Sequence, residues 1–429
     1  MSDAGSTFGP AFLGALEGSL SVLLTLFAGY CAARLRLLDH NTVHRLSKIC
    51  SSLFLPCLIV EQMGPELTAA NLAKLWIIPA WGLVSTAVAH LLGWLGQAVF
   101  KTPYWVIVAS GRPNTSALPL LLLQSLETTG VLKSLAAPGA DTAKVLARAK
   151  SYILLNVVVQ QTITFQLAPS VLRMDDGKHA DEEQGPATLA PVPRKPSGSL
   201  DPGVQDEEHV GLLADHDGHS YGTSQASDFP SALAPIADQP DIHWPQRIQF
   251  LESPLKRIYA SMSPPLIAAI IALILGLIPA LNYAFFDKDS ALYSTLTQSV
   301  ENLGELFVAL QMFTVGAQLA LVPEVRPEYA GTTYAMLVRF LVMPGLSLLF
   351  VWGTAGRGWY VDDKLVWFLL VLIPSGPSAM LLANVAEIVD VDQGPIASYL
   401  TFSYFFSPLM AAVCSLGLIV VEIASKRLS

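Results

Sequence analysis

The sequence predicts an all-α membrane protein with ten transmembrane helices, arranged as two inverted repeats of five helices each. Three observations favour this fold class. Hydrophobic residues make up 52% and charged residues 14% of the 429 positions, whereas an ordinary soluble domain carries about 25% charged residues. Apolar runs long enough to cross a bilayer, about 20 residues each, recur on both sides of one acidic segment. One run in each half is interrupted by prolines.

Ten apolar runs are the predicted transmembrane spans. They cover residues 12–33, 45–63, 75–99, 105–126, 151–172, 264–286, 298–322, 330–353, 365–389 and 396–423. Membrane barrels show roughly ten-residue segments of alternating polarity instead, so the spans are predicted to be helices. The chain then divides into an N-terminal repeat over 1–172, a loop over 173–263 and a C-terminal repeat over 264–429.

The loop between the repeats has the composition of a disordered segment. Residues 175–246 contain 14 Asp or Glu and three Lys or Arg, a net charge of −11 in a chain whose net charge is −9. Such a segment cannot bury enough apolar surface to offset its ordering entropy. We expect a largely disordered loop that offers sites to kinases or other regulatory partners. The acidity belongs to this loop, and no nucleic-acid partner is expected.

Basic residues near the first predicted span set the orientation. Arg34, Arg36, Arg45 and Lys48 lie in or beside the first short loop, whereas the eleven residues before the span contain no Lys or Arg. By the positive-inside rule this loop is cytosolic, and so is the acidic loop that follows the fifth span. The basic residues at 133–150 lie on the opposite side and oppose this orientation.

The fourth predicted span, 105–126, is interrupted at its centre. Pro113 and Pro119 each lack a backbone N–H, and Gly111 weakens the turn before them, so the helix should split into two halves. Polar residues at 112–116 lie between the halves, at a depth where lipid offers no hydrogen bonds. Such a break is tolerated only where it is buried in protein or lines a wet cavity, and in transporters it commonly marks a substrate site.

The ninth predicted span, 365–389, repeats this design with Pro374 and Pro377 at its middle. Pro119 and Pro374 are 255 positions apart, close to the offset of 252 between the first apolar runs of the two halves. Because five is odd, the second repeat enters the membrane from the opposite side, and the two breaks are expected to meet. The candidate substrate-binding residues are Arg112, Pro113, Asn114, Thr115, Ser116, Pro119, Pro374, Ser375, Gly376, Pro377 and Ser378.

The second half of a broken helix presents free N–H groups and positive partial charge at its start. The sequence places these starts near 115–118 and 376–379, and two of them meeting would favour a small carboxylate. Asn114 and the serines at the breaks would complete its hydrogen bonds, and Arg112 would add a fixed positive charge. The alternative interpretation is that the prolines only kink packed helices and that the hydroxyls bond to carbonyls of their own helix.

Two other ionisable residues within predicted spans are candidates for proton coupling. His90 lies in the third span and Glu61 at the end of the second, although each is also explained by packing or by an interfacial position. Arg339 is interpreted as a side chain that snorkels or pairs. The sequence contains no Walker motif, GxGxxG, HExxH or nucleophile triad, so neither an enzyme nor a cofactor or metal site is expected.

Four stretches resemble the auxin efflux carrier superfamily, which comprises the PIN-FORMED and PIN-LIKES membrane transport proteins. Residues 23–57 resemble its first span, basic turn and second span, and Pro113-Asn114-Thr115 with Pro119-Leu120 resembles its fourth-span crossover. Residues 312–317, MFTVGA, are similar to its seventh-span motif, and residues 373–378, IPSGPS, lie where its ninth-span prolines lie. The likeness covers nearly all predicted spans and excludes the central loop.

The resemblance implies a fold of the sodium/proton-antiporter type, with a scaffold domain and a transport domain that contains the crossed fourth and ninth helices. It implies export of a small carboxylate, such as an indole acid, without ATP and by an elevator-like movement. Asn114 matches the crossover asparagine of the first half, whereas the second half departs, with serines at its break and no Asn before Asn384. The short loop of the PIN-LIKES branch favours the endoplasmic reticulum over the plasma membrane, and a homodimer is one expected assembly.

Two alternative functions stay open. One is a sodium-coupled organic-anion symporter of the same fold, which needs acidic and amide oxygens at the crossing, where the sequence supplies few carboxylates. The other is a non-transporting membrane receptor or scaffold that acts through its acidic loop. Sodium dependence of flux tests the first alternative, and deletion of the loop tests the second.

Overall fold

The computed structural model describes residues 2–136, 141–183, 263–322, 328–388 and 391–427. Within these ranges every regular element is a helix, and the one β-type contact is an isolated antiparallel bridge. The all-α prediction is therefore confirmed. Six helices of the described chain are long and apolar enough to cross a membrane, or seven if the bent pair Pro264–Leu277 and Pro279–Phe286 counts as one span. The protein is therefore an integral membrane protein with several spans.

The helices are distributed evenly over the two halves of the described chain. The first half contains α1 (Ser2–Arg34), α2 (His40–Ile49), α3 (Leu55–Met63), α4 (Ala69–Leu75), α5 (Ile77–Phe100), α6 (Trp105–Gly111), α7 (Ala117–Thr128) and α8 (Thr142–Glu183). The second half contains α10 (Pro264–Leu277), α11 (Pro279–Phe286), α12 (Gln298–Leu321), α13 (Tyr329–Leu337), α14 (Met343–Thr354), α15 (Lys364–Leu372), α16 (Leu381–Ile388), α17 (Gln393–Phe405) and α18 (Met410–Ser425). The short elements are the π-helical turns η1 (Cys50–Phe54), η4 (Tyr293–Thr297) and η5 (Val338–Val342) and the 3₁₀ turns η2 (Val131–Leu135) and η6 (Ser407–Leu409).

Two of the π-helical turns lie directly before a proline. Pro56 is the second residue of α3, after η1, and Pro344 is the second residue of α14, after η5. A proline lacks the N–H for the i→i−4 hydrogen bond, and a widened turn before it lets the helix continue. The second and eighth predicted spans are therefore continuous through their prolines, unlike the fourth and ninth.

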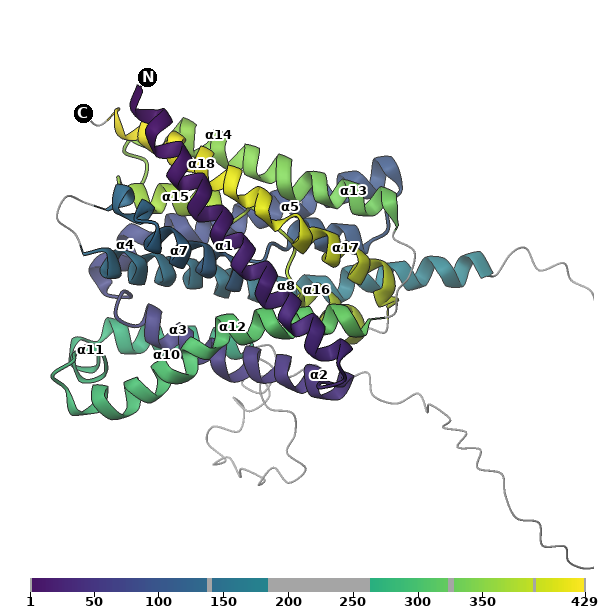
Figure 1. Cartoon of the computed structure of the whole chain (residues 1–429), viewed down its shortest axis with the longest axis horizontal. Coiled ribbons are helices and arrows are strands. Elements are labelled where there is room, and N and C mark those ends of the chain that lie inside the picture. The colour runs from purple at the N-terminus through teal and green to yellow at the C-terminus, as the bar shows by residue number, and fades with distance from the viewer. Residues whose placement is uncertain (1, 137–140, 184–262, 323–327, 389–390, 428–429) are drawn as a thin grey trace, which may run out of the picture.

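Helix α1 lies diagonally across the face seen in Figure 1 and packs against α12, α18 and α7. Two glycines face the opposite backbone where α1 meets α12. A Cβ atom on Gly29 would lie 1.9 Å from the carbonyl oxygen of Phe313, and one on Gly316 would lie 1.8 Å from that of Leu26. No side chain fits at either position, so the two helix backbones touch, as small residues allow in membrane helix pairs.

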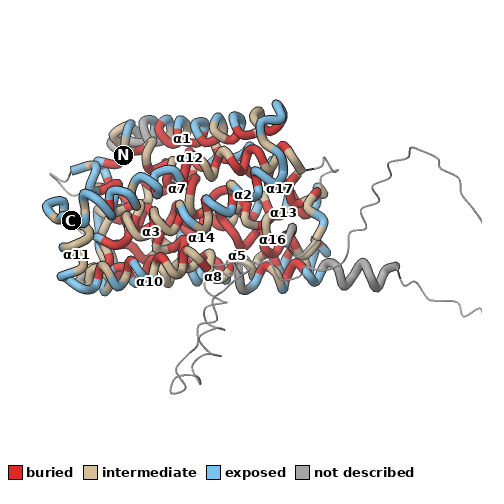
Figure 2. The backbone as a smooth tube through the Cα atoms, turned by 90° about the horizontal axis from the view of Figure 1, so that it is seen from below, coloured by how far each residue is buried: buried red, intermediate tan, exposed pale blue. Residues whose placement is uncertain are grey.

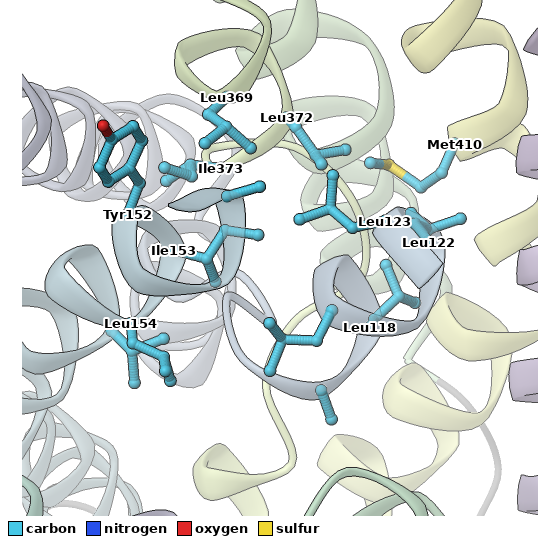
Figure 3. Packing of buried hydrophobic residues seen from close by; sticks show 14 of the residues in the cluster. Leu118, Leu122, Leu123, Tyr152, Ile153, Leu154, Leu369, Leu372, Ile373 and Met410 are labelled. Carbon is cyan, nitrogen blue, oxygen red and sulfur yellow. The ribbon is translucent and has the colours of Figure 1, made fainter. Parts of the chain in front are cut away.

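The interrupted spans form the centre of the molecule. Every residue of α6 is buried, as is α15 from Leu365 to Leu372. In Figure 2 buried stretches instead alternate with exposed ones along α1. Leucines of α7 and α15 pack at the centre against Tyr152 and Ile153 of α8 and Met410 of α18 (Figure 3). The outer helices instead expose large apolar side chains such as Leu24, Leu91 and Leu349. This surface suits a lipid environment.

The structure corrects several predicted boundaries. α8 continues past the predicted end of the N-terminal repeat at 172 to Glu183, with Pro169 inside the helix. The remainder of the predicted disordered loop, 184–262, lies outside the described residues. The predicted span 264–286 is bent by 107° between α10 and α11. The division of the predicted spans 105–126 and 365–389 into two helices each is confirmed, and none of these helices is long enough to cross a bilayer alone.

Candidate functional site

The break in the first half lies between α6, which ends at Gly111, and α7, which begins at Ala117. Arg112 has a φ of −116° and a ψ of 89°, because the ring of Pro113 disfavours helical angles for the residue before it. Ser116 is also non-helical, with a φ of −103° and a ψ of −87°, and its side chain makes no capping hydrogen bond. The chain therefore leaves the helix where the sequence predicts a break.

The break in the second half is longer than the sequence indicates. α15 ends at Leu372 and α16 begins at Leu381, after the predicted start at 376–379. Gly376 lies inside the break with a φ of +92°, in the left-handed region that glycine adopts without strain. A Cβ atom there would lie 3.0 Å from the sulfur of Met410. The break therefore depends on glycine as well as on its two prolines.

The two breaks pair with each other as a short antiparallel bridge centred on Pro113. The backbone N–H of Asn114 donates to the carbonyl oxygen of Pro377 at 2.8 Å. The N–H of Ala379 donates to the carbonyl oxygen of Arg112 at 3.0 Å. This N–H, which precedes α16, is satisfied by the other break. Each break thus satisfies buried backbone groups of the other.

Two tyrosines of α17 contact the side chains of the paired breaks. Asn114 donates from Nδ2 to the phenolic oxygen of Tyr404 at 2.9 Å. The hydroxyl of Ser378 donates to the carbonyl oxygen of Ala109 at 2.6 Å and lies 2.5 Å from the phenolic oxygen of Tyr399. Sequence reasoning selected neither tyrosine. The sequence feature that could have indicated them is a pair of tyrosines inside an apolar span, where each phenolic hydroxyl needs a hydrogen-bond partner.

The remaining candidate residues differ in what their side chains can offer. The hydroxyl of Ser375 donates to the carbonyl oxygen of Val371 in α15 at 2.8 Å. This is the bonding within one helix that the alternative interpretation expected, and it occupies the one hydroxyl proton of Ser375. Thr115 and Pro119 are buried beside the first break, and Pro374 and Pro377 are buried in the second.

Arg112 is the most unusual residue of the first break. Its side chain is 3% exposed, and Nε and Nη1 have no hydrogen-bond partner among the described residues. A guanidinium keeps its charge in proteins. Buried charge at membrane depth is costly unless a partner compensates it. Arg112 can therefore receive an anion from outside the chain.

The two candidates for proton coupling lie in different places. The ring of His90 packs against the first break, because a Cβ atom on Gly111 would lie 2.2 Å from its Cε1, and its Nδ1 lies 2.8 Å from the carbonyl oxygen of Thr86. Glu61 accepts a hydrogen bond of 2.6 Å from Gln62. It lines a groove of α3, α10, α11 and η4 instead. Of the two candidates, only His90 adjoins the breaks.

Arg339 reaches the same place from η5, in the eighth predicted span. Its Nε donates to the carbonyl oxygen of Gly376 at 3.0 Å, and its Nη1 donates to that of Ser110 at 3.4 Å. The side chain is fully buried, so it does not snorkel. The sequence feature that could have indicated a buried role for Arg339 is its charge close to a proline within an apolar run.

A groove of ≈ 640 Å³ lies between α1, α12 and α17, beside the first break. Tyr404, the partner of Asn114, lies in its wall. Its other lining residues are mostly apolar or aromatic and include Leu23, Phe27, Tyr30, Leu319, Phe402 and Phe405, with Arg34 among them. The groove can therefore take a ligand with an aromatic or aliphatic body.

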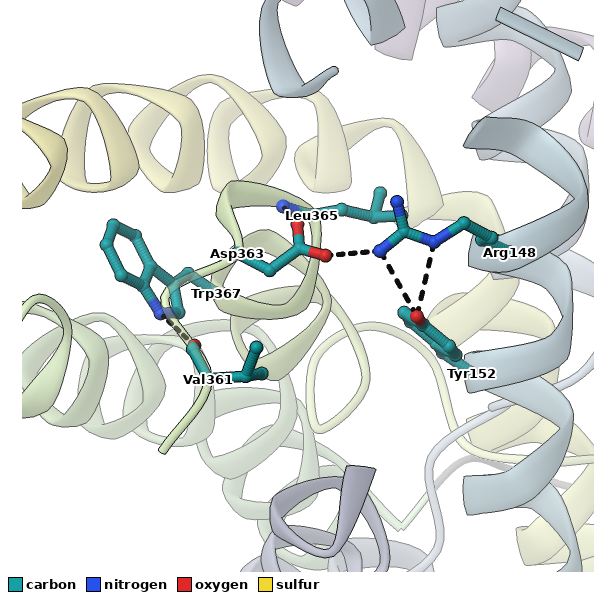
Figure 4. Close-up of polar contacts among 6 residues, drawn as sticks. All are labelled: Arg148, Tyr152, Val361, Asp363, Leu365 and Trp367. Carbon is teal, nitrogen blue, oxygen red and sulfur yellow. Dashed lines mark hydrogen bonds and ion pairs between the residues drawn. The ribbon is translucent and has the colours of Figure 1, made fainter. Parts of the chain in front are cut away.

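A second cavity, of ≈ 650 Å³, lies at the start of α15, and its lining includes the charged residues Glu66, Lys74, Arg148 and Asp363. Arg148 of α8 forms an ion pair with Asp363 there and also donates to the phenolic oxygen of Tyr152 at 3.2 Å (Figure 4). Asp363 caps α15, since its Oδ1 accepts from the N–H of Leu365 at 2.9 Å. Burial raises the pKa of the Glu66 carboxyl in the same cavity. The ion pair thus ties α8 to the first residues of a broken span.

Comparison with known proteins identifies the family. The membrane transport protein family matches residues 15–415 of the chain. The chain is 26% identical over 404 residues to PIN-LIKES 2 of Arabidopsis thaliana, and the matched region covers 87% of this chain and 86% of that protein. It is 24% identical over 443 residues to an uncharacterized transporter of Schizosaccharomyces pombe, with 94% of each covered. The protein therefore belongs to the membrane transport protein family, the auxin efflux carrier family that its interrupted spans resemble.

Proposed function

We propose that this protein is a secondary transporter of a small organic anion and that the paired breaks bind the anionic group. Arg112 is the observation that carries the proposal. It lies in a break, its side chain is 3% exposed, and two of its nitrogen atoms have no hydrogen-bond partner among the described residues. Charge-assisted hydrogen bonds from a guanidinium to a carboxylate are strong and directional. A bound carboxylate would compensate the buried charge.

The groove beside the first break supports an aromatic carboxylate as the substrate. Phe27, Phe402 and Phe405 line it, and the hydroxyl of Tyr404 links its wall to Asn114. An indole or phenyl ring in this groove would pack against aromatic side chains. Its carboxylate would then point toward the crossing. This arrangement agrees with the indole acids that the family resemblance implies.

We further propose ten spans in a 5+5 inverted repeat and an elevator-type movement of the helices around the breaks. The close backbone contact of α1 with α12 at Gly29 and Gly316 supports a scaffold that includes these two helices. The broken spans α6–α7 and α15–α16 would move as one body, since they share backbone hydrogen bonds. An endoplasmic reticulum location and a homodimer belong to the same proposal.

Flux from liposomes tests the function. The purified protein would be reconstituted and loaded with radiolabelled indole-3-acetate, benzoate or hexanoate, with and without sodium. We expect the parent to move at least one of these acids without sodium. Arg112→Gln should reduce that flux by about tenfold or more, because it removes a charge-assisted hydrogen bond.

The matched control is Arg427→Gln, which changes an arginine at the end of α18, far from the breaks in sequence and exposed at the surface. Its flux should equal that of the parent. Equal flux of Arg112→Gln and the parent would refute the binding role of the first break. Flux that requires sodium would favour a symporter instead. Absence of flux for every acid, with function lost on deletion of 184–262, would favour a receptor.

A further inference from the structure

We propose that Arg339 is the positioning residue that holds the two breaks in register. Its guanidinium donates to the carbonyl oxygens of Gly376 and Ser110, at 3.0 and 3.4 Å. Ser110 belongs to the last turn of α6, and Gly376 lies in the break after α15. One fully buried side chain therefore holds the two interrupted spans together, and it comes from a third predicted span. This link adds to the direct bridge between the two breaks.

Both acceptors are carbonyl groups that the breaks deprive of helical partners. The carbonyl of Ser110 is among the last of α6, which have no N–H within the helix and carry negative partial charge, and that of Gly376 lies between two helices. A guanidinium brings a full positive charge and five N–H donors in fixed planar directions. A lysine ammonium brings the same charge as a compact point on a flexible stem. Holding two carbonyls from different spans therefore requires an arginine.

The π-helical turn η5 aims this side chain inward. It covers Val338–Val342, and Val338 and Arg339 are buried whereas Leu341 is exposed. A π turn contains an additional residue and changes which side chains face a given direction. Single turns of this kind occur frequently at functional sites. The same turn lets the helix continue through Pro344 and directs the side chain of Arg339 inward.

Arg339 differs from Arg112 in what it can do. Nε and Nη1 of Arg339 donate to backbone carbonyls and its Nη2 has no partner among the described residues, whereas both Nε and Nη1 of Arg112 lack one. Arg339 is therefore suited to fix the geometry and Arg112 to bind a guest. The consequence for transport rests on the proposed function, whereas the register of the breaks can be measured without any substrate.

Disulfide crosslinking measures this register. Pro113→Cys and Ser378→Cys would be introduced after the four native cysteines are replaced by alanine. Positions 113 and 378 form a non-hydrogen-bonded antiparallel pair, whose Cα atoms lie about 4.5 Å apart, within disulfide range. We expect rapid crosslinking in membranes under mild oxidant. Arg339→Met and Arg339→Lys should each slow it about tenfold.

Arg427 provides the matched control, since its Nη1 also donates to two carbonyls, those of Trp352 and Ala355. Arg427→Met should leave the crosslinking rate unchanged. A parental rate in Arg339→Met would overturn the positioning role. A parental rate in Arg339→Lys alone would overturn the need for arginine geometry. If Arg339→Met fails to give monodisperse protein, Arg339→Gln replaces it, and a parental rate in that variant would overturn the positioning role.

Flux separates this proposal from the proposed function. Arg339→Lys should raise the KM for a transported acid about tenfold while changing the maximal rate less, because it misplaces the binding groups without removing them. Slow crosslinking of Arg339→Lys in a protein whose parent moves no acid would support the positioning role and refute the transport proposal. Crosslinking of Arg339→Lys at the parental rate, together with transport by the parent, would refute the positioning role and support the transport proposal.

Discussion

Asn114 in the first break donates a hydrogen bond of 2.9 Å from Nδ2 to the phenolic oxygen of Tyr404 in α17. Tyr404 also lines the groove between α1, α12 and α17. The bond therefore links the paired breaks to the wall of the groove. A ligand in the groove would contact a tyrosine whose position depends on the break.

Tyr404→Phe removes the acceptor of this bond and should leave the amide of Asn114 without its partner. Such an orphaned buried donor costs about 1–3 kcal/mol. We expect a lower midpoint of thermal unfolding and a higher KM in liposome flux with the best-transported acid. Tyr283→Phe is the control, because Tyr283 is exposed on α11. An unchanged KM for Tyr404→Phe would contradict the link between break and groove.

Gly29→Ala or Gly316→Ala should destabilise the protein, because each added methyl group would overlap the backbone of the facing helix. Overpacking of this kind costs about 1–3 kcal/mol. Unfolding in detergent, followed by fluorescence against temperature, measures the loss. Gly345→Ala in α14 is a matched control, since nothing lies within 4 Å of its added Cβ. Equal stability of the Gly316 and Gly345 variants would contradict the close contact of α1 and α12.

The ion pair of Arg148 with Asp363 should contribute little on its own. Both side chains are partly exposed, at 37% and 20%, so a double-mutant cycle with Arg148→Gln and Asp363→Asn should give a coupling of about 0.5–1 kcal/mol. Asp363→Ala should cost about 1 kcal/mol more than Asp363→Asn, because asparagine also caps helices and alanine does not. Equal losses for these two variants would exclude a capping role for Asp363.

Glu66 should make stability depend on pH. Burial raises the pKa of its carboxyl above the ordinary 4.5, although nearby Arg148 opposes the shift. A group whose pKa is higher in the folded than in the unfolded state stabilises the fold below the unfolded value, and this contribution is lost as pH rises through the folded value. Glu66→Gln should therefore unfold at a higher temperature than the parent at pH 7 and at the same temperature near pH 4. A difference that is the same at both pH values would refute this.

The positions of the breaks could be predicted because they depend on local chemistry. Pro113 disfavours helical angles for Arg112, and Gly376 adopts a positive φ that glycine allows without strain. Prolines alone did not suffice, however. Pro56 and Pro344 resemble the break prolines in sequence, yet π-helical turns keep their helices continuous.

Features that depend on contacts between distant segments could not be predicted. The start of α16 at Leu381, beyond the predicted 376–379, accompanies a bond from the N–H of Ala379 to the carbonyl of Arg112 in the other break. Arg339 was interpreted as a snorkelling or paired residue, and only the surrounding helices show that its partners are carbonyls of the breaks. Which of the candidate residues contact a substrate stays a prediction.

The sharing of amide hydrogen bonds between the breaks also has a consequence for biogenesis. A ribosome delivers the 112–116 segment to the membrane long before it makes 374–378, and until then the N–H of Asn114 has no Pro377 to bond to. The nascent first half therefore enters the lipid with an incomplete interior. Truncation before 374 is therefore expected to leave the first break without the backbone partners that it has in the full chain.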